Sequence, residues 1–192
     1  MLPEVALFVH LLPSIRDQDT DKLPLYYQER EFIRILIAYG WEKVDEERYL
    51  WQHLFEELEE IALATPVFQQ IGKQYRTMLE DGEMPDEKAL IQTMTGEAKD
   101  EVINLVTERF QASKNWARFE IIVPDKDAFL GELVRTNILR IKYRHLEKMC
   151  KEVLSGLSTA EDLDAVMEGQ QLYLNLKNEK SQLAKLLGIV IP

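Results

Sequence analysis

Two long amphipathic segments at the end of the chain constrain its fold more than any other feature. Residues 125–155 and 159–187 both repeat apolar side chains at helical spacing, and Gly156-Leu157-Ser158 lies between them. Helices joined by so short a connection pack antiparallel. The sequence therefore predicts a helical hairpin that ends in the apolar tail Gly188-Ile189-Val190-Ile191-Pro192.

A hairpin of this length has more surface than the rest of a 192-residue chain can cover. We therefore expect it either to pair with a second copy or to carry a docking surface for another protein. The alternative is that its apolar stripe packs entirely on the protein's own bundle, because an uncovered patch is an aggregation hazard in a monomer. Ser158 and Glu161 have the spacing of a capping box and are expected to begin its second helix.

Shorter amphipathic segments precede the hairpin. Apolar residues at helical spacing predict helices over residues 25–40, 46–62, 66–82, 86–96 and 97–111. Thr65-Pro66 and Asp86 are typical helix starts, and Gly40 and Gly82 are placed to end helices. Only residues 115–123 have an irregular or briefly extended pattern. The sequence predicts an all-α fold, a helical bundle followed by a long C-terminal helical hairpin.

These segments divide the chain into three parts. Residues 1–24 are expected to form an N-terminal helix and linker, residues 25–140 the helical bundle, and residues 141–192 the C-terminal hairpin and tail.

Charge is unevenly distributed along the chain. The net charge is −11, which disfavours nonspecific binding to duplex DNA because phosphates must be neutralised by clustered cations. Residues 42–60 hold eight acidic and two basic side chains, whereas residues 135–151 hold six basic side chains and one acidic. The two segments either face each other or lie in solvent. Otherwise the basic stripe binds an acidic peptide or, less in keeping with the net charge, a nucleic acid. The candidate residues for the acidic peptide are Arg135, Arg140, Arg144 and Lys148.

No arrangement of side chains indicates catalysis, a cofactor or a bound metal. His10, His53 and His145 lie far apart, and none follows a glutamate at the spacing of a di-iron or zinc helix. Cys150, the single cysteine, has apolar neighbours and is expected to be a buried structural thiol. The apolar run at residues 5–12 is too short to cross a bilayer. We expect a cytoplasmic, non-enzymatic interaction domain.

Apolar side chains of the last helix and the tail are the candidate contacts with a partner. Leucines recur along residues 163–187, and Tyr173 is an aromatic residue of the kind enriched in binding hot spots. The expected anchors are Leu183, Leu186, Leu187, Ile189 and Ile191, with Tyr173 and Lys185 at the edge of the contact.

The first regular helix resembles a known sequence. Tyr26-Tyr27-Gln28-Glu29-Arg30-Glu31-Phe32-Ile33-Arg34-Ile35-Leu36-Ile37-Ala38-Tyr39-Gly40 resembles the opening helix of the C-terminal domain of bacterial DnaG-type primases, which has the form Glu-Arg-Glu-apolar-apolar-Arg-apolar-Leu and ends in a glycine. The features that follow in the same order are Thr65-Pro66, Phe68, Tyr75, the Leu79-x-x-Gly82 helix end, the short helix of residues 86–94, a long helix and a terminal hairpin. The resemblance covers residues 26–192.

The resemblance implies a fold and a function. That family's domain is a helical bundle with a C-terminal hairpin, similar in fold to the N-terminal domain of the replicative helicase. It binds this DnaB-type helicase and couples primer synthesis to the replication fork, and in some members it also binds the acidic tail of the single-stranded-DNA-binding protein. The primase zinc ribbon and catalytic core have no counterpart here, so the resemblance implies a non-catalytic domain of a DNA primase. The alternative from a different class is a homodimeric helical scaffold or regulator that self-associates through the hairpin.

Overall fold

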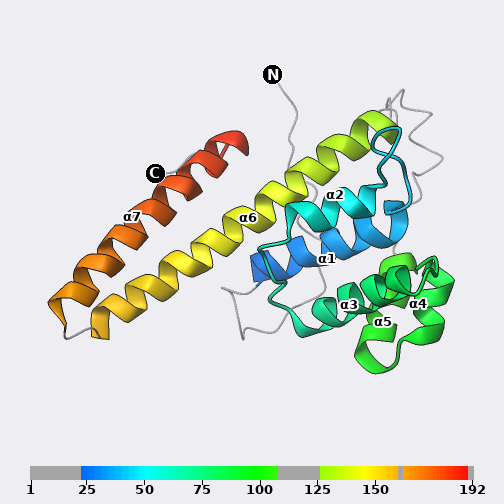
Figure 1. Ribbon diagram of the computed structural model, residues 1–192, viewed down its shortest axis with the longest axis horizontal. Helices are drawn as coiled ribbons and strands as arrows, with labels where there is room; N and C mark the ends of the chain where they lie inside the picture. Colours follow the sequence, from blue (N-terminus) through cyan, green and yellow to red (C-terminus); the bar gives the residue numbers. More distant parts are fainter. Residues whose placement is uncertain (1–22, 108–125, 160–161, 190–192) are drawn as a thin grey trace, which may run out of the picture.

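A computed structural model of the protein describes residues 23–107, 126–159 and 162–189 (Figure 1). The regular elements in these ranges are seven helices, and an isolated bridge joins Lys43 to Tyr49. The helices are α1 (Leu23–Tyr39), α2 (Leu50–Glu57), α3 (Pro66–Glu80), α4 (Glu87–Thr93), α5 (Gly96–Thr107), α6 (Lys126–Thr159) and α7 (Leu163–Leu186). The predicted all-α fold, a helical bundle followed by a C-terminal hairpin, is confirmed.

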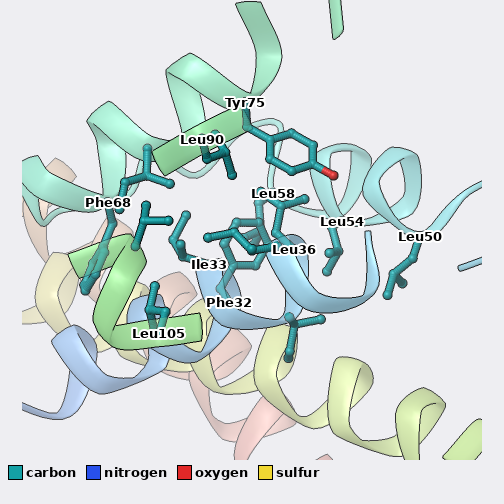
Figure 2. Close-up of a cluster of buried hydrophobic side chains, with 14 of the residues drawn as sticks. Phe32, Ile33, Leu36, Leu50, Leu54, Leu58, Phe68, Tyr75, Leu90 and Leu105 are labelled. Carbon is teal, nitrogen blue, oxygen red and sulfur yellow. The ribbon is translucent and has the colours of Figure 1, made fainter. Parts of the chain in front are cut away.

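Helix α1 lies at the centre of the bundle and contacts α2, α3, α5 and the first half of α6 (Figure 1). A helix that is apolar on most of its faces is expected to be surrounded by other elements. The second half of α1 fits this pattern, because Phe32, Ile33, Ile35, Leu36 and Ile37 are all buried. Side chains from the other helices close around them (Figure 2). They include Leu54 and Leu58, Phe68 and Tyr75, Leu90, Val102 and Leu105, and Val134, Ile138 and Ile141.

Polar residues of α1 fix the positions of its neighbours. Glu29 is buried, and its carboxylate accepts hydrogen bonds from the backbone N–H groups of Ala64 and Thr65, just before α3. Arg30 forms an ion pair with Glu101 of α5, with an Nε–Oε1 distance of 2.7 Å. Glu29 and Arg30 therefore connect α1 to two other helices.

Helix α3 begins and ends close to where the sequence predicts, whereas α4 begins as predicted but ends at Thr93, because Gly96, expected to close it, begins α5 instead. Thr65 is the N-cap of α3, and Pro66 occupies its first turn. At the other end Gly82 has a positive φ of 76°, and the N–H of Glu83 donates to the carbonyl of Met78 at 2.8 Å. The Asp86 carboxylate accepts a 2.7 Å hydrogen bond from the N–H of Ala89, which caps α4.

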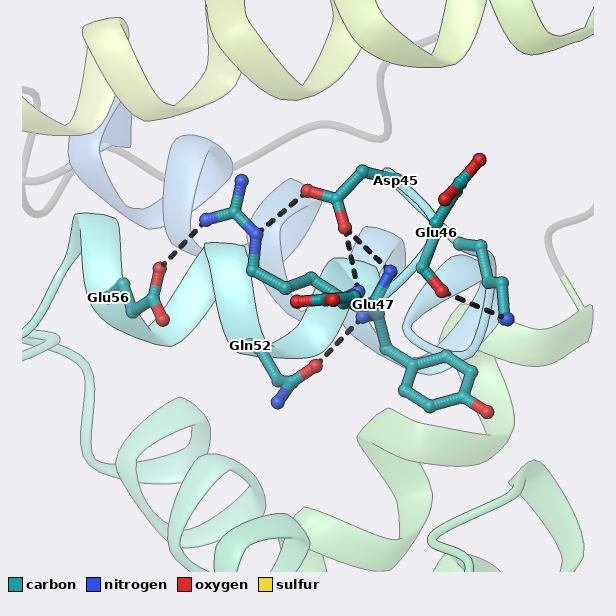
Figure 3. A network of polar contacts seen from close by, with 8 residues as sticks. Asp45, Glu46, Glu47, Gln52 and Glu56 are labelled. Carbon is teal, nitrogen blue, oxygen red and sulfur yellow. Dashed lines mark hydrogen bonds and ion pairs between the residues drawn. The ribbon is translucent and has the colours of Figure 1, made fainter.

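Helix α2 begins later than predicted because Asp45 holds a turn in front of it (Figure 3), and it ends at Glu57 rather than at residue 62. One Asp45 oxygen accepts the backbone N–H groups of Glu47 and Arg48, and the other pairs with the Arg48 side chain at 2.8 Å. The Gln52 side chain accepts the N–H of Tyr49. Such local hydrogen bonds compete with helical ones, so the helix begins at Leu50 rather than at residue 46.

The connection predicted at Gly156-Leu157-Ser158 is wrong, because α6 continues through these residues to Thr159. The hydroxyl groups of Ser158 and Thr159 donate to the carbonyls of Ser155 and Gly156, as expected inside a helix. The N-cap of α7 is Asp162, so the predicted start of the second helix at Ser158 is also wrong. Glu161, the other half of the predicted capping box, lies outside the described residues.

Three predicted features lie outside the described residues. They are residues 1–22 of the N-terminal helix and linker, the irregular segment at residues 115–123 and the end of the fifth helix after residue 107. Residues 23 and 24, predicted as the end of the linker, belong to α1. The expected boundary between residues 140 and 141 falls inside α6, which is continuous there. The first half of α6 packs on α1, and the second half forms the hairpin with α7 (Figure 1).

Candidate protein-docking site

The hairpin is held together by a seam of buried and half-buried side chains between α6 and α7. Its α7 members recur at alternating spacings of three and four residues, the heptad pattern of antiparallel helix pairs. They are Val166, Gly169, Tyr173, Leu176, Lys180, Leu183 and Leu187. The matching positions of α6 include the buried Tyr143 and Cys150. The Lys180 ammonium group lies 5.8 Å from the centre of the Tyr143 ring and so joins the two helices directly.

Close packing near the tip of the hairpin depends on Gly169. A Cβ atom at this position would lie 2.7 Å from a terminal methyl carbon of Leu157 on α6. The glycine therefore lets Leu157 pack against the backbone of α7. This contact stabilises the continuation of α6 past Gly156, because Leu157 packs on α7 as part of α6.

Helix α7 packs chiefly on α6 and leaves bulky apolar side chains exposed. Leu163, Met167 and Leu174 follow one another along the solvent side of the helix, with exposures of 71%, 62% and 58%. We call these three residues the outer row. Leu186 and Ile189 are also exposed, and we call them the C-terminal pair. Leu172, almost half exposed, lies on the opposite side of α7 from the outer row.

The predicted partner-binding residues divide into two groups. Leu186, Ile189 and Lys185 are exposed and available to a partner. Tyr173, Leu183 and Leu187 are half-buried and belong to the seam, so their positions are explained by packing on α6. Ile191 lies outside the described residues. Sequence periodicity alone did not separate the groups, because leucines occur on both the inner and the outer sides of α7.

The outer row was not singled out from the sequence, although its three residues belong to the stripe of the last helix. The heptad spacing of the seam identifies the outer row, because it fixes which side of α7 faces α6. Once Tyr173 and Leu176 are assigned to the inner side, Leu163, Met167 and Leu174 must lie outside.

The basic stripe of α6 is only partly gathered into one place. Arg144 and Lys148 line a pocket of about 510 Å³ together with Lys151. The other wall of the pocket comes from the start of α1 and the residues just before and at the start of α3, including Tyr26 and Pro66. Arg144 is paired with Glu147 at 2.7 Å, and Lys148 lies 3.8 Å from Glu152. The predicted acidic-peptide residues Arg135 and Arg140 are exposed and do not line this pocket.

One contact supports the expectation that the acidic and basic segments face each other. The Lys142 ammonium group of α6 lies 2.6 Å from a carboxylate oxygen of Glu57 on α2. The hydrogen bond from Lys142 lowers the pKa of Glu57, although partial burial opposes the shift. The pair therefore stabilises the folded protein above the usual pKa of a glutamate, and this contribution is lost as the pH falls through the lowered pKa.

Among the described residues, no group of three or more potential metal ligands occurs. Cys150 is buried in the seam, as predicted for a structural thiol. The buried Tyr75 hydroxyl lies in the bundle core, where desolvation raises its pKa well above the usual range for a tyrosine. None of the described helices has both the length and the apolar character needed to cross a membrane.

Comparison with known proteins yields one family. A family model described as a domain of unknown function (DUF8430) matches residues 15–190, which is most of the chain. No curated protein and no solved structure matches the sequence.

Proposed function

We propose that this chain, which belongs to the DUF8430 family, is the non-catalytic docking domain of a DNA primase. Its hairpin binds the replicative helicase of the DnaB type and so couples primer synthesis to the replication fork. The observation that carries the proposal is the exposed apolar surface of α7, formed by the outer row and the C-terminal pair.

Exposed apolar side chains in this number are a marker of a binding surface. Burying a leucine or isoleucine completely contributes about 1.5–3 kcal/mol before the costs of association. Leu163, Met167 and Leu174 retain more than half of their exposure in the folded chain, so most of that contribution is still available to a complex. The C-terminal pair adds exposed apolar area at the other end of α7, where Leu186 lies on the same side of the helix as Leu172.

The choice of partner is supported by the order of sequence features that the chain shares with DnaG-type primases. The glutamate and the arginine that open the motif, Glu29 and Arg30, have structural roles that fix the positions of α3 and α5. Thr65-Pro66 begins α3 and Gly82 follows its end, in the order that the resemblance requires. The bundle and the terminal hairpin also occur in the expected order.

The test is a binding measurement between the full chain and the replicative helicase of the same organism. We expect the double substitution Leu186→Asp and Ile189→Asp to weaken binding at least about tenfold, which corresponds to about 1.4 kcal/mol. Charged groups at these positions would have to be desolvated in the complex, yet both residues are exposed in the free chain and tolerate them.

Gln182→Asp is the matched control, because Gln182 is exposed one helical turn before Leu186. It adds one negative charge to the same helix without removing an apolar side chain, and binding should remain within about threefold of the unsubstituted chain. Circular dichroism verifies that every variant is folded. An unsubstituted chain that does not bind the helicase, or a double variant that binds as well as the control, contradicts the proposal.

A further inference from the structure

The hairpin has an uneven distribution of charge along its length. From residue 152 to residue 174 the sequence includes five acidic side chains and no lysine or arginine. From residue 175 to residue 187 it includes three lysines and one glutamate. The tip of the hairpin, where α6 and α7 meet (Figure 1), is therefore negative. The end of α7 that lies farther back along α6 is positive.

The outer row lies within the negative part. Asp164 follows Leu163 directly, and Glu168 follows Met167, so both carboxylates lie beside the row on the solvent side of α7. Both are exposed, and neither pairs with a cation among the described residues. Asp162 and Asp164 also favour the start of α7 by interacting with the helix dipole. Glu168 lies beyond the first turn, so the helix dipole does not explain the presence of a carboxylate at this position.

A second copy of the chain fits this surface poorly in either orientation. If two α7 helices pack in parallel, the two outer rows meet, but the negative halves of the two hairpins then lie side by side and repel each other. If they pack antiparallel, the outer row meets the second half of the same helix side, where Asn178, Ser181 and Lys185 replace apolar residues. The first arrangement brings like charges together, and the second buries the outer row against polar side chains.

We infer that the tip of the hairpin binds a surface of a different protein in which apolar side chains are flanked by lysine or arginine residues. The apolar side chains would cover Leu163, Met167 and Leu174, and the flanking cations would meet Asp164 and Glu168. The inference rests on the proposed function and defines the chemistry of the helicase surface that the hairpin recognises. Charges at the edge of a contact act mostly on the association rate, which then decreases as salt is added.

The experiment measures association of the full chain with the intact helicase at a series of salt concentrations. The double substitution Asp164→Lys and Glu168→Lys should lower the association rate about tenfold or more at low salt and remove its decrease with added salt. The neutral variant Asp164→Asn and Glu168→Gln should give an intermediate rate, which excludes misfolding as the cause. Glu179→Lys is the control, because it reverses one carboxylate in the positive half of α7, and its rate should stay within about twofold.

The outcomes separate the inference from the proposed function. Binding that is normal in the unsubstituted chain but unaffected by salt and by reversal of Asp164 and Glu168 overturns the inference and leaves the proposed function standing. Absence of binding by the unsubstituted chain overturns both. A stable dimer of the free chain in analytical ultracentrifugation, disrupted by Met167→Asp, also overturns the inference, since it would assign the outer row to a second copy.

Discussion

Replacing Glu29 with alanine is expected to lower the free energy of unfolding by about 3 kcal/mol, the largest effect we expect from a polar substitution. The Glu29 carboxylate accepts hydrogen bonds from two backbone N–H groups, those of Ala64 and Thr65, and is itself buried. Each buried group left without a partner costs about 1–3 kcal/mol. The substitution also removes an anion from the start of α3, where the helix dipole favours one.

Urea denaturation followed by circular dichroism measures the effect of Glu29→Ala. In thermal unfolding of a chain of this size, the same loss of free energy should lower the melting temperature by roughly 6–12 °C. Glu31→Ala is the matched control, because Glu31 is only half-buried and pairs with Arg34 one turn further along the same helix. The control should change the free energy of unfolding by about 0.5 kcal/mol or less. An equal effect of the two substitutions would show that Glu29 does not hold α3 in place.

The second large effect is expected at Leu176, which should release α7 from α6 when it is replaced with aspartate. Leu176 and Ala184 are the buried residues of α7, so the hairpin depends strongly on this one leucine. Loss of a buried leucine costs about 2–5 kcal/mol, and a carboxylate in its place must also be desolvated. Because α7 packs chiefly on α6, the bundle should remain folded while α7 opens.

Hydrogen–deuterium exchange separates local opening of α7 from global unfolding. Amides of α7 should exchange about 100-fold faster or more in Leu176→Asp, whereas amides in the centre of α1 keep their protection. Leu174→Asp, two residues away and exposed, should change exchange in α7 less than about threefold. Faster exchange throughout the chain would mean that the bundle and the hairpin unfold as one unit.

The parts of the fold that the sequence predicted correctly are those set by local chemistry. Asp86, Thr65-Pro66 and Gly82 act within one turn of their own helix, so their effects do not depend on the rest of the chain. Gly40 was also expected to end a helix, and α1 does end before it. The cause is different, however. Gly40 does not have a positive φ, and a side chain there would collide with the Tyr75 hydroxyl and the carbonyl of Leu36.

The incorrect predictions concern residues whose conformation is set by distant contacts. Gly156 looks like a helix end in sequence, yet Leu157 beside it packs on Gly169 and belongs to α6. The exposure of the candidate site residues also depends on distant contacts and could not be predicted from the sequence. Leu183 and Leu186 look equivalent in sequence, but only the seam places the first against α6 and leaves the second exposed. The pocket beside Arg144 also depends on residues brought together from three helices.

The central claim is that the outer surface of α7 contacts the helicase, and site-specific photo-crosslinking tests it most directly. A photoreactive phenylalanine derivative is placed at Met167 in the outer row or, as a control, at Lys73, an exposed residue of α3 in the bundle. After irradiation of the full chain mixed with the helicase, the account predicts a crosslinked product from position 167 and none from position 73. Crosslinking from position 73 without crosslinking from position 167 would contradict it.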